Sequence, residues 1–90
     1  MTYAKAVDQN QKQIVAHLRM RGATVECLHA IGGGVPDLLV GWCGDNILIE
    51  VKMPKGKLNP MQCSWHGTWE GLAHVVHDVH EVDEVLQLYG

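Results

Sequence analysis

The chain has 90 residues, of which 47% are hydrophobic and 19% charged, a composition typical of a single globular domain with a modest core. It contains no apolar run of the roughly 20 residues that a membrane span needs, and no basic-then-apolar signal at its start, so we expect a cytoplasmic protein without membrane contact. The formal net charge of −3 argues against a nucleic-acid partner unless charge is segregated, because phosphate binding usually leaves a basic footprint.

The first predicted element is a helix over about residues 4–21, with Gly22 as its stop. Its apolar residues follow helical spacing: Ala4, Val7, Ile14, Val15 and Leu18. Gln11 falls inside this apolar stripe, and Asp8 lies at its edge, where the helix dipole favours an acid in the first turn. Residues 24–30 then predict the first strand of an antiparallel meander.

A β-hairpin is predicted next, because two apolar runs, 38–40 and 47–49, are separated by the turn-forming residues 44–46. Side chains alternate between the two faces of a strand, so one face of the hairpin should be apolar and able to pack on helices. The residues of that face are Leu38, Val40, Ile49 and Val51.

The other face of the hairpin carries three charged residues. With the turn centred between Gly44 and Asp45, Asp37 lies opposite Lys52 and diagonal to Glu50. Diagonal neighbours sit roughly 7–8 Å apart at the backbone. Two carboxylates at that separation can share one hard divalent cation.

A second helix is predicted to start at the sequence Asn59-Pro60, with Asn as N-cap and Pro at the first helical position. Gln62, in its first turn, is aimed toward the end of the strand that carries Lys52, and exposed amides there favour an anion such as a phosphate. The helix has an apolar face whose two tryptophans are interpreted as core residues rather than base-stacking or dimer contacts. That face consists of Leu58, Met61, Trp65, Trp69 and Leu72.

Residues 73–79 predict a fourth strand, and the pattern Asp78-x-x-Glu81 resembles a capping box that opens a last helix. The predicted order of elements is therefore αβββαβα. Histidine and cysteine do not predict a zinc site, because the histidines spaced by three point to opposite faces of a strand and the cysteines are widely separated. These residues are His74, His77, His80, Cys27, Cys43 and Cys63.

Two motifs resemble a known group of proteins. Pro36-Asp37 followed by Glu50-Val51-Lys52 on adjacent strands resembles the PD-(D/E)xK nuclease superfamily. The glycine run 32–34 and the sequence Gly-Lys-Leu-Asn-Pro-Met-Gln at 56–62 resemble, more narrowly, its VRR-Nuc branch, which includes small stand-alone phage proteins. The resemblance covers nearly the whole chain. It implies one α/β domain over residues 1–90 with an αβββαβ(α) restriction-endonuclease-like core, a mixed four-stranded sheet flanked by helices.

The resemblance also implies a metal-dependent endonuclease. Asp37, Glu50 and the backbone carbonyl of Val51 are the expected ligands of Mg²⁺ or Mn²⁺, whose preferred ligands are oxygens. Lys52 is expected to orient the attacking water and stabilise developing charge, and Gln62 to position the water or the phosphate. The family usually adds an acidic residue from the first helix, for which the candidates here are Asp8, Gln9 and Gln11.

DNA is the expected partner, and Lys55, Lys57, Gly33 and Gly34 are the candidate DNA-binding residues. The glycines would let a sugar-phosphate backbone approach closely, although a flexible connection between strands explains them equally well. The lysines near the site and the acids near the C-terminus predict a bipolar surface. The acids are Asp78, Glu81, Asp83 and Glu84.

Stand-alone members of this branch are expected to form homodimers, and two sites related by a two-fold axis suit symmetric cutting of a four-way (Holliday) junction, as in DNA repair. Flaps and other branched DNA are the alternative substrates. The absence of a base-reading helix favours structure-selective cleavage. Two other classes stay open: a non-catalytic DNA-binding module with the nuclease fold, and a small metal-storage or regulatory domain. A phage-encoded member would act in the cytoplasm of the host cell.

Overall fold

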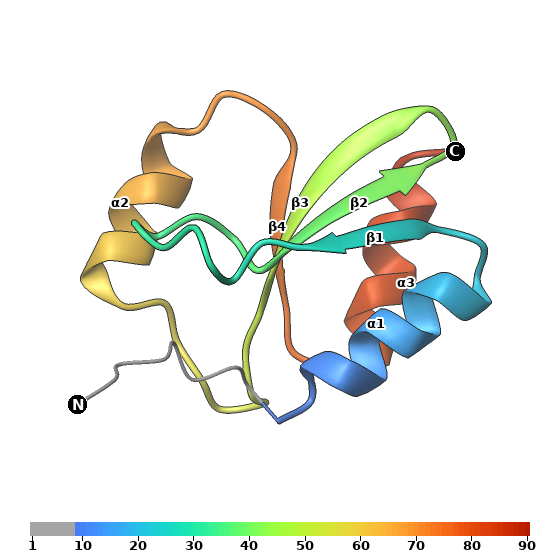
Figure 1. Cartoon of the computed structure of the whole chain (residues 1–90), viewed down its shortest axis with the longest axis horizontal. Coiled ribbons are helices and arrows are strands. Elements are labelled where there is room, and N and C mark those ends of the chain that lie inside the picture. The colour runs from blue at the N-terminus through green and yellow to red at the C-terminus, as the bar shows by residue number, and fades with distance from the viewer. Residues whose placement is uncertain (1–8) are drawn as a thin grey trace.

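A computed structural model describes residues 9–90, and within that range helices flank a four-stranded sheet (Figure 1). The elements follow the predicted order αβββαβα. Their bounds are α1 Gln11–Met20, β1 Thr24–Cys27, β2 Leu38–Trp42, β3 Asp45–Val51, α2 Pro60–Thr68, β4 Ala73–Val76 and α3 Val79–Leu88. No helix in the described range is long and apolar enough to cross a membrane.

The sheet has the strand order β1-β2-β3-β4, in which the first three strands are antiparallel and β4 runs parallel to β3. Helices α1 and α3 lie together on one side of the sheet, and α2 lies on the other (Figure 1). The core between the sheet and the α1–α3 pair contains the predicted apolar face of the hairpin. Its fully buried members include Leu38, Val40, Ile47, Ile49, Val51, Ile14, Leu18, Val82 and Leu86.

The hairpin turn differs from the prediction by one position. Cys43 and Gly44 form the turn with φ of 50° and 87°, and Trp42 pairs with Asp45, the first residue of β3. Positive φ at both central residues is the geometry of a type I′ turn, whose twist matches that of the flanking strands. The shift moves each facing residue by two places, so the same side chains stay on the same face. Asp37 is therefore in line with Glu50, one step beyond the Leu38–Ile49 pair, rather than opposite Lys52.

Three element ends also differ from the predictions, each for a local reason. Helix α1 begins at Gln11, and the predicted part before residue 9 lies outside the described range. β1 ends at Cys27 because the Ile31 N–H bonds the Leu28 carbonyl at 2.9 Å and closes a turn. β4 ends at Val76 because Asp78 accepts a hydrogen bond from the Glu81 N–H at 2.8 Å and starts α3 where predicted. The expected return bond differs by one residue, since the Glu81 carboxylate accepts from the His77 N–H rather than from that of Asp78.

The interpretation of the tryptophans of α2 as core residues is wrong. Trp69 is 47% exposed and Met61 60% exposed, while the buried residue of this helix is the polar Gln62. The rings of Trp65 and Trp69 stack with their centroids 4.7 Å apart. Because α2 turns its polar side to the sheet, its apolar residues Met61, Trp65 and Trp69 form an α2 stripe directed away from the core.

Candidate active site

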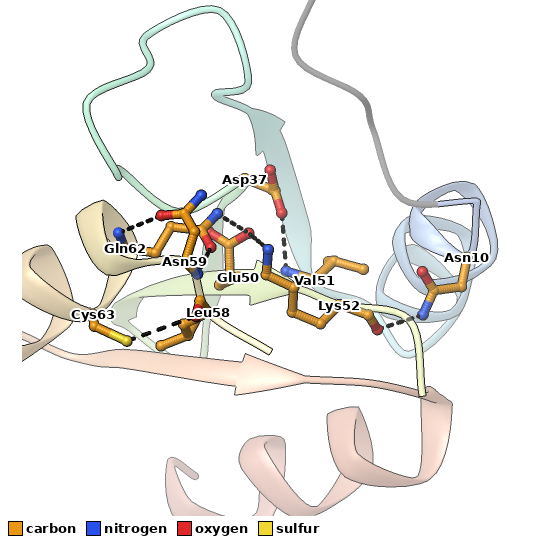
Figure 2. Close-up of polar contacts among 9 residues, drawn as sticks. All are labelled: Asn10, Asp37, Glu50, Val51, Lys52, Leu58, Asn59, Gln62 and Cys63. Atoms are coloured by element: carbon orange, nitrogen blue, oxygen red, sulfur yellow. Dashed lines mark hydrogen bonds and ion pairs between the residues drawn. The ribbon is translucent and has the colours of Figure 1, made fainter. Parts of the chain in front are cut away.

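The first acid of the site, Asp37, lies immediately before β2 and is only 4% exposed. Its Oδ2 accepts a hydrogen bond from the Val51 N–H at 3.0 Å, which ties the start of β2 to the end of β3 (Figure 2). The Asp37 carbonyl accepts a second bond from the Leu28 N–H at 2.6 Å. One bond therefore holds the carboxylate against β3, and the other holds the backbone of Asp37 against the end of β1.

The second acid, Glu50, is 1% exposed and lies on β3 beside Asp37. Its Oε2 accepts a hydrogen bond from Gln62 Nε2 at 3.3 Å and lies 4.0 Å from Lys52 Nζ, whose side chain is 15% exposed. The four predicted catalytic side chains are thus brought together between the strand ends and α2 (Figure 2). At 4.0 Å the ammonium group attracts the carboxylate without a short hydrogen bond, so its N–H groups can serve another oxygen.

Gln62 is oriented by a capping box. Its Oε1 accepts from the Asn59 N–H at 3.0 Å, and its own N–H donates to Asn59 Oδ1 at 2.8 Å. Because the amide oxygen is used by the cap, the amide NH₂ faces Glu50. The cap also occupies first-turn amides that the sequence analysis had assigned to an anion. The spacing Asn59-x-x-Gln62 is the signal from which this second role of Gln62 could have been read.

Gly34 seats α2 against the loop that precedes Asp37. A Cβ atom at this position would lie 2.6 Å from the Met61 carbonyl oxygen and 3.2 Å from the Trp65 Cβ, and its φ is +84°. Gly33 is exposed and Gly34 buried, and a cavity of about 220 Å³ lies where the glycine loop meets the start of α2. Lys55 and Lys57 are exposed in the segment before α2. The DNA contacts expected of these residues stay predictions.

We expect Gly34→Ala to lower the free energy of unfolding by more than Gly33→Ala does. Both replacements force alanine into a left-handed conformation, with φ of +84° and +68°, at a cost of about 1–3 kcal/mol each. Only at Gly34 does the new methyl group also collide with the backbone of α2, since nothing lies within 4 Å of a Cβ at Gly33. Urea unfolding of both variants measures the difference. Equal losses would show that Gly34 does not seat the helix.

The sequence analysis did not identify Asn10 as a site residue, but its side chain bonds the backbone of Lys52 at the edge of the site. Its Nδ2 donates to the Lys52 carbonyl at 2.9 Å and to the His77 carbonyl at 2.8 Å, so it joins the start of α1 to the ends of β3 and β4. Among the helix-one candidates, Gln11 is buried, Gln9 is exposed, and Asp8 lies outside the described residues. Asn10 thus holds the backbone that carries Lys52.

The residues present fit a hard divalent cation. Asp37 and Glu50 are adjacent buried carboxylates, and Lys52 offsets part of their negative charge. Within residues 9–90 no group of three or more His, Cys, Asp or Glu could hold a metal, so further ligands must be carbonyl or water oxygens. Mg²⁺ is usually bound by one or two carboxylates and keeps several waters. The Val51 carbonyl suits this role, because the N–H and C=O of a strand residue point to the same neighbouring strand and the Val51 N–H points at Asp37.

Comparison with known proteins agrees with this architecture. A solved structure described as a VRR_NUC domain is similar to this chain with a TM-score of 0.70 and 27% sequence identity, covering 89% of this chain and 92% of that one. No protein-family model and no curated protein matches the chain by sequence. The chain has the VRR-Nuc fold, and with it the fold of a nuclease, as the motifs predicted.

Proposed function

We propose that the chain is a Mg²⁺- or Mn²⁺-dependent endonuclease that hydrolyses phosphodiester bonds in branched DNA. The observation that carries this proposal is the convergence, in a nuclease fold, of two buried carboxylates, a lysine and an oriented amide at one end of the sheet. An ordinary ion pair at the end of β3 would account for Glu50 and Lys52 alone. It would not account for a second buried acid or for an α2 that turns its glutamine rather than its tryptophans inward.

Each residue has a distinct role in this reaction. Asp37, Glu50 and the Val51 carbonyl would hold the cation. When bound, the cation supplies Lewis-acid polarisation of the phosphate and lowers the pKa of a bound water. Lys52 orients the attacking water and donates to the phosphate oxygen on which negative charge builds up. Gln62 fixes the rotamer of Glu50 through its amide, so that the carboxylate is preorganised before substrate binds.

The distribution of charge supports DNA as the partner despite the net negative charge. Lys55 and Lys57 lie in the segment that leads into α2, whereas the acids gather on α3, on the opposite side of the sheet (Figure 1). One of these acids, Asp83, is ion-paired with Arg21; a hydrogen bond from His17, aided by the charges of His17 and Arg21, holds its pKa below its ordinary value and keeps it ionised. On the predicted bipolar surface, DNA approaches the side that carries Lys55 and Lys57 and not the side that carries the acids of α3.

The most direct test is incubation with single-stranded, duplex, flap and four-way DNA in Mg²⁺, Mn²⁺ or EDTA. We expect metal-dependent nicking of branched substrates and none in EDTA. The runner-up is a non-catalytic DNA-binding module, which would bind the same substrates in every buffer without nicking them. Absence of both binding and nicking would contradict both proposals.

We further propose that the active form is a homodimer that pairs through the α2 stripe. Within residues 9–90 this stripe lies outside the hydrophobic core: Met61 and Trp69 are exposed and Trp65 is half-buried. Its two stacked indole rings bring a large apolar area to any contact. A two-fold axis would make the same stripe meet itself in both copies. Because Gln62 lies on the inward side of the same helix, pairing would set two active sites at a fixed separation. Such a pair suits two cuts in a four-way junction.

Trp69→Asp is expected to convert the dimer to a monomer, because two like charges would be buried at the two-fold contact. Ser64→Asp is the matched control, since it adds the same charge at an exposed position of the same helix outside the stripe. Light scattering should give about the chain mass of 10.0 kDa for Trp69→Asp and twice that mass for the control and the unmodified protein. Equal masses for all three would rule out pairing through this stripe.

A further inference from the structure

A groove of about 420 Å³ lies between α1 and β1, outside the candidate active site. Its lining combines small apolar residues with basic ones and contains no acidic residue. The apolar members are Val15, Ala16 and Cys27, the basic ones are Lys12, Arg19 and His29, and Gln11 completes the lining. A groove with only basic charged residues in a chain of net charge −3 selects an anionic ligand with an apolar body.

The groove lies on the α1 face of the sheet, opposite the face that carries the acids, and reaches the same end of the sheet as the candidate active site. β1 ends next to the start of β2, because Cys27 pairs with Leu38, and the Leu28 N–H bonds the Asp37 carbonyl. At the other side of the same sheet end, Asn10 bonds the Lys52 carbonyl. Two residues of the groove are therefore next in sequence to residues that bond the backbone of the candidate active site. His29 follows Leu28, which bonds Asp37, and Gln11 follows Asn10, which bonds Lys52. To reach the groove from the site, a DNA strand would therefore have to pass around the end of β1.

Gln11 adds a specific hydrogen-bonding group to the groove. The residue is 5% exposed, and its Oε1 has no hydrogen-bond partner among the described residues. A buried acceptor without a partner costs about 1–3 kcal/mol, which a ligand with an N–H donor can recover. Amino groups on the edges of adenine, cytosine and guanine are such donors.

We propose that this groove binds one unpaired nucleotide of the DNA strand that crosses the active site. The base lies against the apolar lining residues with its edge toward Gln11, and the flanking phosphates contact Lys12 and Arg19. The volume is that of a site for one small ligand, and a base that is paired and stacked in a duplex would have to flip out to enter it. This inference rests on the proposed function, because it names the form of DNA that the same site prefers: branched DNA with an unpaired strand next to the cut.

Alkylation of the three exposed cysteines tests this placement without any mutation. Cys27 lies in the groove, whereas Cys43 lies in the hairpin turn at the far end of β2. A saturating single-stranded oligonucleotide in EDTA should slow alkylation of Cys27 by about tenfold or more and leave Cys43 at its free rate, measured by peptide mass spectrometry. A duplex of the same length should protect Cys27 far less. Equal rates at Cys27 and Cys43, or equal protection by duplex, would overturn the proposal.

Two variants of α1 provide a second test by fluorescence anisotropy. Ala16→Glu fills the groove and adds a negative charge, while Gln13→Glu adds the same charge at an exposed position outside the lining. We expect the Kd for single-stranded DNA in EDTA to rise at least tenfold for Ala16→Glu and less than twofold for Gln13→Glu. Lys12→Gln, which removes one charge without steric change, should lower the salt dependence of binding by about 0.7 in the log–log slope. Equal Kd values for the two glutamate variants, or no change for Lys12→Gln, would contradict the groove.

The outcome for the groove is separable from that for the nuclease. All readouts of the groove are binding measurements in EDTA, where no cleavage is expected. Nicking of branched DNA by the unmodified protein in Mg²⁺ tests the active site by itself. Protection of Cys27 without any nicking would retain the groove and reject the nuclease, whereas nicking without protection would do the reverse.

Discussion

Lys52→Ala is expected to lower kcat for metal-dependent cleavage by at least about 10²–10³-fold, the usual cost of removing one preorganised group that stabilises transition-state charge. Its Nζ is 4.0 Å from Glu50 Oε2, at the edge of the acid pair that would hold the metal. Because the interaction is made mainly in the transition state, DNA affinity in EDTA should change little. Single-turnover cleavage of a labelled branched substrate measures the effect.

Lys55→Ala is the matched control for this change. Lys55 is exposed, so its loss should weaken DNA binding and raise KM while kcat is kept. If the Lys52→Ala variant kept the kcat of the unmodified protein, Lys52 would have no role in the reaction.

The stability of Lys52→Ala gives a second readout, because the two buried carboxylates lose a nearby positive charge. Added Mg²⁺ should therefore raise the Tm of this variant by more than it raises that of the unmodified protein.

That the side chains of the candidate site lie together could be predicted from the sequence, because an error of two residues in strand register leaves each side chain on its face. The turn was expected at Gly44-Asp45 and lies at Cys43-Gly44, which moved Asp37 from opposite Lys52 to the level of Glu50. A shift of two residues keeps every side chain on its face, whereas a shift of one would have turned Asp37 into the core. Spacing alone therefore determined which side chains meet, but not which of them face one another directly.

The orientation of α2 could not be predicted in the same way. Helical periodicity identified an apolar face, but it carries no information about which surface covers that face. Tertiary contacts reverse the usual arrangement: Gln62 is drawn inward by Glu50, and Gly34 allows the α2 backbone to come close enough for this bond. In this position the helix buries an amide that satisfies a carboxylate, and it leaves Trp65 half-buried and Trp69 exposed.

The contribution of Asn10 was beyond prediction for a different reason. Its amide bonds two backbone carbonyls that are 42 and 67 residues away in the sequence. A backbone carbonyl is present at every position, so such a contact leaves no residue pattern. Motifs made of side chains, such as the pair Asp37 and Glu50, can be found by spacing, whereas the groups that hold their backbone in place cannot.

Asp37→Asn is expected to abolish stabilisation by Mg²⁺ or Mn²⁺ together with cleavage. The replacement keeps the shape and the acceptor for the Val51 N–H, so the fold should survive. Loss of one of two adjacent buried negative charges should leave the metal-free protein as stable as before or more so. In the unmodified protein, metal at a hundredfold excess over Kd adds about 2.7 kcal/mol to the free energy of unfolding. For a domain of this size that corresponds to a rise in Tm of roughly 10–20 °C.

Thermal unfolding with increasing Mn²⁺ separates this expectation from a general ionic effect. Asp45→Asn is the control, because it makes the same substitution at the turn end of β3, away from the site. The control should show the full metal-dependent rise in Tm, and Asp37→Asn should show none at any concentration. A normal rise for Asp37→Asn would mean that the cation binds elsewhere, and the paired carboxylates would then need a role other than metal binding. Parallel loss of the Tm rise and of nicking would instead assign both properties to one cation at Asp37.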